Sequence, residues 1–178
     1  LAFDISEEYD TPVMLRLSTR ISHSQSLVEL GEREERARKE YVKNPGKYVM
    51  MPAMAKARHV VVEERLCKLT ELSDKLAKAE IHTDKIGVIA AGIAYQYAKE
   101  ALGDSVSYLK LAMVNPLPVE AVKAFAAKHE KIYVIEELDP VIEKHCRALG
   151  LDVIGKEAFT LLGEYTAPMI AKAILGKE

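Results

Sequence analysis

Cysteine is scarce in this sequence, and neither sign of charge is in clear excess. Only Cys67 and Cys146 occur, far apart and outside any CxxC pair, which excludes a disulfide framework or a zinc knuckle and fits a reducing cytoplasm. The 25 basic and 27 acidic residues argue against a surface that coats nucleic acid. No apolar run is long enough to span a membrane, and no signal peptide is visible. We therefore expect a cytoplasmic protein with neither nucleic acid nor a membrane as its partner.

Several motifs with a known chemistry are also missing. A dinucleotide fingerprint needs GxGxxG, whereas the stretch AAGIAY contains only Gly92. We expect a turn glycine there, and a weak anion site at the start of the following helix is the alternative. No G-x-S-x-G motif occurs, and no motif indicates a catalytic cysteine–histidine couple. We predict no metal site, because none of the five histidines has the spacing of a metal ligand: His23, His59, His82, His129 and His145.

The clearest structural pattern lies in the stretch from Lys85 to Leu117. Residues 86–90 form an almost continuous apolar run, which suits a strand buried on both faces of a parallel sheet. Gly92 interrupts the run, and apolar residues at three- and four-residue spacing then predict a helix that ends at Gly103. Residues 106–114 predict a second strand. Strand, helix and strand together make a right-handed βαβ unit.

The remaining C-terminal sequence continues this alternation. Asp139 is expected to cap, and Pro140 to open, the helix after the third strand. The pattern predicts an α/β fold, with a mostly parallel sheet in a three-layer α/β/α domain over residues 84–178. Its further elements are expected in the order helix, strand, helix, short edge strand and helix: residues 119–126, 132–135, 140–149, 151–154 and 169–175.

The first half of the chain does not fit this α/β pattern. We expect a strand at Val13–Leu17, then a polar loop, and then a charged stretch at residues 24–41 that is a solvated helix or a flexible connector. Asn44-Pro45-Gly46 indicates a turn. An uninterrupted pattern from Pro52 to Glu80 predicts an amphipathic helix, packed on its own domain rather than in a coiled coil.

The most chemically promising cluster directly follows the strand expected at Val13–Leu17. It consists of Thr19, Arg20, Ser22 and His23. Arginine can hold a carboxylate or a phosphate, and the hydroxyl groups add hydrogen-bond donors. The alternative is a polar loop in which Arg20 makes an interdomain ion pair, and the residues alone favour neither.

A pair of carboxylates, Glu136 and Glu137, follows the predicted strand 132–135. This is the edge at which α/β sheets bind their ligands. Adjacent residues of an extended chain point to opposite sides, so the two carboxylates are not a ready acid–base pair. A structural role such as an interface salt bridge is the favoured interpretation, and a weak ligand site is the alternative.

Five separated stretches carry a family resemblance: PVMLRLSTRISHSQS, NPGKYVMMPAMAKARH, IAAGIAYQYAKEAL, LKLAMVNPLP and VIEELDPVIEKH. In this order they resemble the alpha subunit of indolepyruvate ferredoxin oxidoreductase, a thiamine diphosphate-dependent 2-oxoacid oxidoreductase. The resemblance covers essentially the whole chain. It implies that residues 1–24 are the C-terminal end of a pyrimidine-binding domain, residues 25–83 a helical linker, and residues 84–178 a transketolase C-terminal-like domain.

The resemblance also implies an activity. The family oxidatively decarboxylates aryl 2-oxoacids such as indolepyruvate with coenzyme A, giving acyl-CoA, carbon dioxide and reduced ferredoxin. The intact enzyme is expected to use thiamine diphosphate, Mg²⁺ and [4Fe–4S] clusters, with the magnesium motif beyond this C-terminus and the activating glutamate before Leu1. Its expected protein partners are a small beta subunit, a second alpha subunit and ferredoxin.

We therefore expect an internal segment that is structural, makes subunit contacts, holds no complete cofactor site and is inactive by itself. One alternative is a stand-alone module that binds a nucleotide or coenzyme A with Gly92 and Glu136. Another is the corresponding domain of a transketolase or a 2-oxoacid dehydrogenase. The stretches TRISHS and PAMAKARH speak against the latter.

Overall fold

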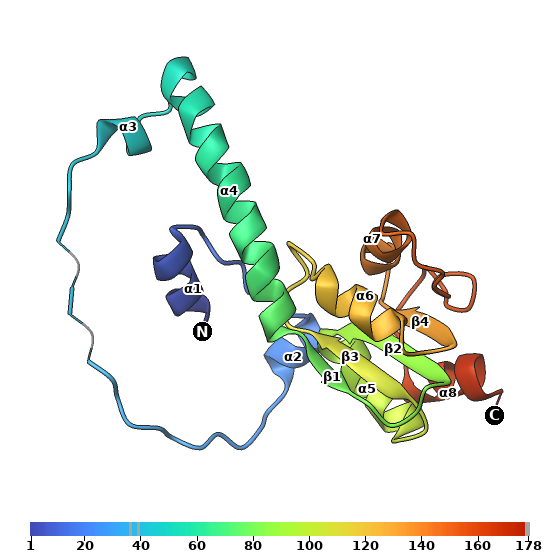
Figure 1. Cartoon of the computed structure of the whole chain (residues 1–178). Coiled ribbons are helices and arrows are strands. Elements are labelled where there is room, and N and C mark those ends of the chain that lie inside the picture. The colour runs from blue at the N-terminus through green and yellow to red at the C-terminus, as the bar shows by residue number, and fades with distance from the viewer. Residues whose placement is uncertain (36, 39, 177–178) are drawn as a thin grey trace. The chain divides into compact units, whose positions relative to one another are not determined.

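The computed structural model of the chain describes residues 1–35, 37–38 and 40–176 (Figure 1). The chain divides into two compact units, Leu1–Arg65 and Leu66–Glu178. The first contains α1 (Ala2–Tyr9), α2 (Thr19–His23), α3 (Pro45–Tyr48) and most of α4 (Pro52–Leu76). The second contains the end of α4 and then, in chain order, β1 (Lys78–Glu80), β2 (Ile86–Ala91), α5 (Gly92–Leu102), β3 (Ser107–Leu111), α6 (Glu120–Ala126), β4 (Lys131–Ile135), α7 (Val141–Ala148) and α8 (Ala167–Leu175).

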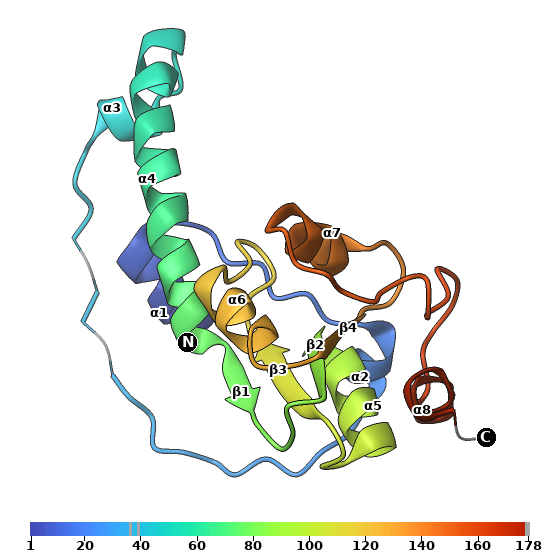
Figure 2. The ribbon, with the colours of Figure 1, turned by 45° about the vertical axis from the view of Figure 1, so that its right-hand side comes forward.

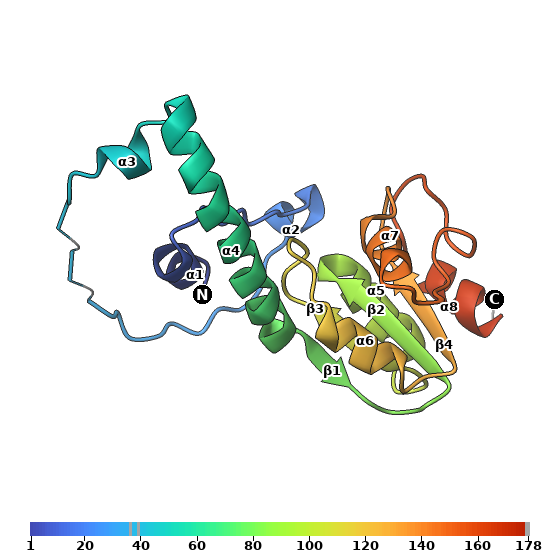
Figure 3. The ribbon, with the colours of Figure 1, turned by 45° about the horizontal axis from the view of Figure 1, so that its top comes forward.

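The second unit is built on a four-stranded sheet in the order β1-β3-β2-β4. Strands β3 and β4 both run parallel to the interior strand β2, while β1 runs antiparallel to β3 at one edge (Figure 3). In this register Val88 of β2 lies opposite Tyr108 on one side and Tyr133 on the other. The predicted α/β fold with a mostly parallel sheet is thus confirmed.

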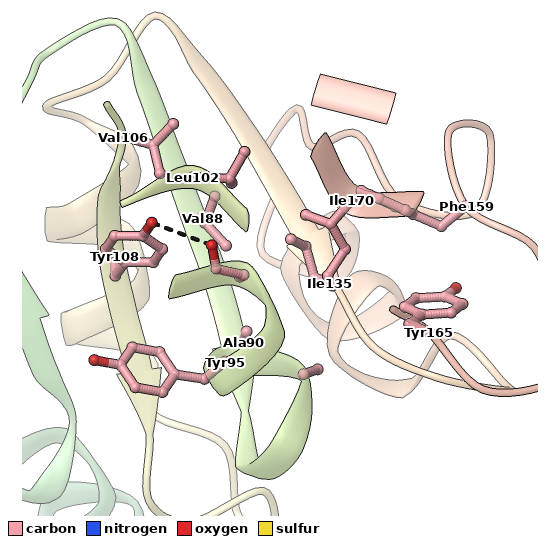
Figure 4. Packing of buried hydrophobic residues seen from close by; sticks show 12 residues of the cluster. Val88, Ala90, Tyr95, Leu102, Val106, Tyr108, Ile135, Phe159, Tyr165 and Ile170 are labelled. Carbon is pink, nitrogen blue, oxygen red and sulfur yellow. Dashed lines mark hydrogen bonds between the residues drawn. The ribbon is translucent and has the colours of Figure 1, made fainter. Parts of the chain in front are cut away.

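Helices cover both faces of this sheet, because the side chains of β2 alternate between two apolar clusters. Val88 and Ala90 belong to one cluster, together with Tyr95 of α5 and Ile170 of α8 (Figure 4). Ile89 belongs to the other cluster, which also holds buried residues of α6 and α7: Val122, Phe125, Ile142 and Cys146. Two helix layers therefore enclose the strands, as the alternation in the sequence predicts (Figure 2).

The end of the long helix differs from the prediction. The apolar pattern predicts a helix as far as Glu80, but α4 ends at Leu76 and residues 78–80 form β1. The edge of β3 offers unpaired backbone groups, and pairing with them outweighs the helix propensity of this short polar stretch. In the part of α4 that belongs to the second unit, Leu69 and Ser73 are buried.

The strand predicted at Val13–Leu17 is not formed. No ladder pairs with these residues in the described chain, and their apolar side chains are exposed, with Met14 at 90%. A strand needs a partner edge, which local sequence cannot supply. The expected loop at residues 19–23 is instead the short helix α2, because the Oγ of Ser18 caps its first turn by accepting from the N–H of Ile21 at 3.4 Å.

Two smaller predictions are corrected in the same way. The turn at residues 44–46 is the start of the single-turn helix α3, where the Asn44 side chain accepts from the N–H of Lys47 at 3.1 Å. The predicted edge strand 151–154 is only an isolated bridge between Tyr133 and Ile154. The described residues of the stretch 24–41 form no helix. Among the residues that the structure describes, no helix is both long and apolar enough to cross a membrane.

Candidate functional site

The carboxyl ends of β2 and β4 define the best candidate for a ligand site in the second unit. These strands are neighbours, with Ala90 opposite Ile135, and the chain leaves them for opposite faces of the sheet. In open α/β sheets the crevice at such a reversal is where ligands bind. Gly92 follows β2 and Glu136–Glu137 follow β4, so the fold brings the three predicted residues to one edge.

Gly92 makes the turn from β2 into α5. Its φ of 53° lies in the left-handed region, and a Cβ built there meets nothing within 4 Å. The glycine is therefore required by the backbone conformation and not by a lack of space. The helix N-cap, Ala91, has no side-chain acceptor for the first N–H groups of α5.

Glu136 caps α7 with its carboxylate. One oxygen accepts from the N–H of Val141 at 3.1 Å and of Ile142 at 2.8 Å, and the other accepts from the N–H of Glu143 at 2.9 Å. A carboxylate satisfies these orphan donors and interacts favourably with the helix dipole. The predicted cap, Asp139, does not make this contact. The chain turns back through Leu138, whose φ of 61° is left-handed, and this brings Glu136 onto the helix end.

Glu137 contacts the segment that leads into α8. Its carboxylate accepts from the backbone N–H of Tyr165 at 2.8 Å, just before α8. The two neighbouring carboxylates thus fasten α7 and the approach to α8 to the end of β4. Neither Glu136 nor Glu137 is placed to exchange a proton with the other.

Sequence reasoning missed the other half of this polar cluster. The ammonium group of Lys156 donates to the carbonyl oxygen of Glu136 and, at 2.8 Å, to the hydroxyl of Tyr165. The backbone N–H of Lys156 donates to the buried carboxylate of Glu143 at 2.9 Å. These residues lie far apart in the chain, so no local pattern indicates them. Only Glu143 could have been noticed in the sequence. It is a charged residue that directly follows Ile142, a position on the apolar face of the predicted helix.

The packing around Glu143 explains one glycine of this cluster. A Cβ at Gly155 would lie 2.1 Å from the Glu143 carboxylate, so no other residue fits without displacing that side chain. Arg147 completes the arrangement, since its Nε donates to Glu143 at 3.0 Å. The buried carboxylate is therefore both paired and hydrogen-bonded, as burial of a charge requires.

The pKa shifts of Lys156 and Tyr165 indicate that the polar cluster at this edge of the sheet has a structural role and not a catalytic one. Burial lowers the pKa of Lys156, and the surrounding carboxylates, Glu136 foremost, oppose that effect. Burial also raises the pKa of Tyr165 to about 12, so its hydroxyl keeps its proton at neutral pH. The charged groups are engaged by backbone donors and by each other. The cluster can position α7 and α8, and it presents no group poised as a general base.

The second candidate, residues 19–23, belongs to the first unit. The hydroxyl groups around α2 are used by the helix itself: Ser22 donates to the carbonyl of Ser18 at 3.1 Å, and Ser24 donates to that of Ile21 at 2.8 Å. Thr19 occupies the first helical position. Arg20 is half-buried, and His23 is exposed.

The described residues do not fit the metal groups that the resemblance implies for an intact enzyme. Cys67 is exposed on α4, and Cys146 is buried in the core, where burial raises the pKa of its thiol to about 11. Two such cysteines cannot supply the thiolates of an iron–sulfur cluster. Within the described ranges, no group of three or more histidine, cysteine or acidic side chains could hold a metal ion.

The fold as a whole has a counterpart of known structure. It resembles part of a 2-oxoglutarate:ferredoxin oxidoreductase from Magnetococcus marinus, with a TM-score of 0.56 and 20% identity over 71% of this chain and 24% of that chain. The chain is thus an α/β protein with the fold found in a 2-oxoacid:ferredoxin oxidoreductase. No family model matches it.

Sequence comparison identifies the family. The indolepyruvate oxidoreductase subunit IorA of Archaeoglobus fulgidus is 37% identical to this chain, over 88% of this chain and 26% of the relative's own length. The protein of the same name from Methanothermobacter marburgensis is also 37% identical, over 98% of this chain and 31% of its own length. The protein of that name from Pyrococcus abyssi is 32% identical over 97% of this chain and 30% of its own length. The chain belongs to this family of oxidoreductase subunits and spans under a third of the length of these relatives.

Proposed function

We propose that this chain is a segment of an oxidoreductase subunit that acts on aryl 2-oxoacids such as indolepyruvate. The proposed reaction is oxidative decarboxylation with coenzyme A, giving acyl-CoA, carbon dioxide and reduced ferredoxin. The observation that carries the proposal is the match of 88–98% of the chain to subunits named for indolepyruvate. The proposed location of the enzyme is the cytoplasm.

Within that enzyme, we assign a structural role to the second unit. Its strand-end carboxylates support this role, because Glu136 and Glu137 already bind the backbone of α7 and of the segment before α8. Residues 84–178 would be the transketolase C-terminal-like domain, residues 25–83 a linker and residues 1–24 the end of a pyrimidine-binding domain. Thiamine diphosphate, Mg²⁺ and [4Fe–4S] clusters would be bound elsewhere in the enzyme, which would pair this subunit with a small beta subunit and a second alpha subunit.

The test compares the chain alone with the enzyme assembled from full-length subunits. Purified samples of each receive indolepyruvate, coenzyme A and ferredoxin, and reduced ferredoxin and acyl-CoA are measured. We expect turnover only by the assembled enzyme. Decarboxylation of an arylpyruvate by the chain alone would contradict the structural role, and an assembled enzyme inactive on every aryl 2-oxoacid would contradict the substrate class.

Arg20 is the residue we propose to lie near the substrate or a domain interface, together with Ser22 or His23. In the full-length enzyme, Arg20→Gln should raise the KM for the 2-oxoacid or lower the melting temperature. Arg33→Gln, a change of the same charge in the exposed connector, should do neither. Unchanged kcat, KM and stability in Arg20→Gln would contradict this assignment.

A second candidate function is a stand-alone module for a small ligand such as a nucleotide or coenzyme A. It is favoured by one observation, the convergence of Gly92 and Glu136 at the ends of neighbouring strands β2 and β4. Titration of the chain with nucleotides, coenzyme A and thiamine diphosphate tests it. Saturable binding at micromolar concentration that Glu136→Gln changes would favour this module over the structural segment.

A further inference from the structure

A cluster of three cationic side chains in the first unit is not used by the function proposed above. Lys47 of α3, Arg58 and Arg65 of α4 all lie around one carboxylate, that of Asp10. Lys47 and Arg58 come from the stretch NPGKYVMMPAMAKARH, which the sequence analysis singles out as a family motif. Among these four side chains, three positive charges face one negative charge.

The geometry around Asp10 leaves both guanidinium groups short of hydrogen-bond partners. Lys47 donates to one oxygen of Asp10 at 2.6 Å, whereas the Nη2 atoms of Arg58 and Arg65 lie 3.8 and 3.6 Å from the other oxygen. Those two distances are too long for hydrogen bonds. Within the described residues, neither guanidinium group has a hydrogen bond or an ion pair besides the one to Asp10. Each carries five N–H donors in a planar fork.

These arginines are nevertheless held in place. The side chains of Arg58 and Arg65 are only 26% and 16% exposed, and they lie seven residues apart on α4, which puts them on the same side of the helix. Asp10 is fixed as the left-handed C-cap of α1, with φ of 53°. Three helices therefore hold the cations and the carboxylate in a defined arrangement, which limits the side-chain entropy that the site would lose on binding a ligand.

We propose that Lys47, Arg58 and Arg65 form a binding site for a phosphate dianion, in which Asp10 is an internal competitor for the same cations. Of the three cations, only Lys47 lies within hydrogen-bond distance of the Asp10 carboxylate. A phosphate group has three terminal oxygens and double charge, and the arginine fork matches its geometry. Lys47 and Asp10 also line a depression that Glu7 and Glu40 border, whereas neither arginine lines it, so the proposed site adjoins that depression on Lys47 alone.

Substitution of Asp10 separates a ligand site from a purely structural ion-pair cluster. Inorganic phosphate is titrated into the 178-residue chain by calorimetry, and melting temperatures are measured with and without it. In Asp10→Asn we expect phosphate to bind more tightly, by roughly threefold or more. The substitution removes the negative charge that competes for the cations, and the interaction energy lost is that of a typical surface ion pair. A structural cluster would instead lose stability in Asp10→Asn and gain no affinity.

Substitution of an arginine should have the opposite effect to Asp10→Asn and weaken phosphate binding. Arg65→Gln should weaken phosphate binding by roughly tenfold or more, which is typical for loss of a charge-assisted hydrogen bond. Should this variant fail to fold, Arg65→Lys keeps the charge, removes the fork and should bind phosphate more weakly than the natural chain. Lys56→Gln, an exposed position on the same helix, is the charge-matched control and should leave binding unchanged.

Free phosphate and phosphate esters share this chemistry, so two further titrations separate them. Coenzyme A, the phosphorylated cosubstrate of the proposed reaction, is compared with dephospho-coenzyme A and with inorganic phosphate. Binding of coenzyme A at least tenfold tighter than both would identify an ester as the ligand, and equal affinities would identify free phosphate. Absence of saturable phosphate binding in both the natural chain and Asp10→Asn, or an equal loss in Lys56→Gln, would overturn the proposal.

Discussion

Ser73 lies in the buried seam of α4 with only 1% of its surface exposed, and its hydroxyl has no hydrogen-bond partner within the described residues. A buried, unsatisfied polar group costs about 1–3 kcal/mol. We predict that Ser73→Ala raises the free energy of unfolding, by about 1 kcal/mol, as measured by urea denaturation. A decrease in stability would mean that the hydroxyl makes a contact in solution, and Ser26→Ala, at an exposed position of the stretch 24–41, serves as the control.

Glu136 is the residue with the most backbone partners at the carboxyl edge of the sheet. We predict that Glu136→Ala lowers the free energy of unfolding by about 1–2 kcal/mol, because three N–H groups of α7 lose their acceptor and the helix dipole loses its counter-charge. Urea denaturation at neutral pH measures the change. Glu100→Ala, at an exposed position of α5, removes the same charge and should change stability little. Equal effects of both substitutions would refute the capping role.

At the scale of elements, β1 is tied to α5 by a group of polar side chains. Lys99 of α5 donates to the Glu80 carboxylate at 2.8 Å, and the hydroxyl of Tyr95 donates to its other oxygen. These hydrogen bonds, that of Lys99 foremost, hold the pKa of Glu80 below its ordinary value of 4.5. A short edge strand thus gains side-chain tethers in addition to its ladder with β3.

This tether predicts a dependence of stability on pH. Because the folded-state pKa of Glu80 is lowered, its contribution to stability is present above about pH 4.5 and is lost as the pH falls through the folded-state value. Urea denaturation of the natural chain and of Glu80→Gln from pH 7 to pH 3 measures it. We expect the stability difference between the two to shrink on acidification. A difference that stays constant over this range would show that the Glu80 charge does not stabilise β1.

For the whole molecule, the uneven distribution of helices and strands along the chain predicts where a protease cuts first. The described part of the stretch 24–43 contains no helix or strand, and its basic residues such as Arg33 and Lys43 are exposed. Cleavage requires local unfolding, which is least costly where few contacts must break. We predict that brief trypsin digestion cuts this stretch before the α/β unit, leaving an intact piece with β2 to α8, as mass spectrometry would reveal. Simultaneous cleavage within β2–β4 would contradict this prediction.

The sequence alone was sufficient where the relevant information is local. The apolar run of β2, the glycine turn at Gly92 and the helical spacing of α5 predict the βαβ unit, and the alternation that follows predicts the layers around it. Such periodicities reflect burial on one face or on both. The positions of Gly92, Glu136 and Glu137 at strand ends were predictable for the same reason, because the order of elements fixes which ends share an edge.

Tertiary structure decided the features that depend on a partner distant in the chain. Val13–Leu17 has the composition of a strand but pairs with no strand of the described chain, whereas the polar residues of β1 pair with the edge of β3 and become a strand. The partners of Glu136, and the meeting of Asp10 with Lys47, Arg58 and Arg65, likewise leave no local pattern. Periodicity records whether a residue is buried, but a hydrogen bond or an ion pair is made with a particular group, and only the folded backbone brings that group within reach.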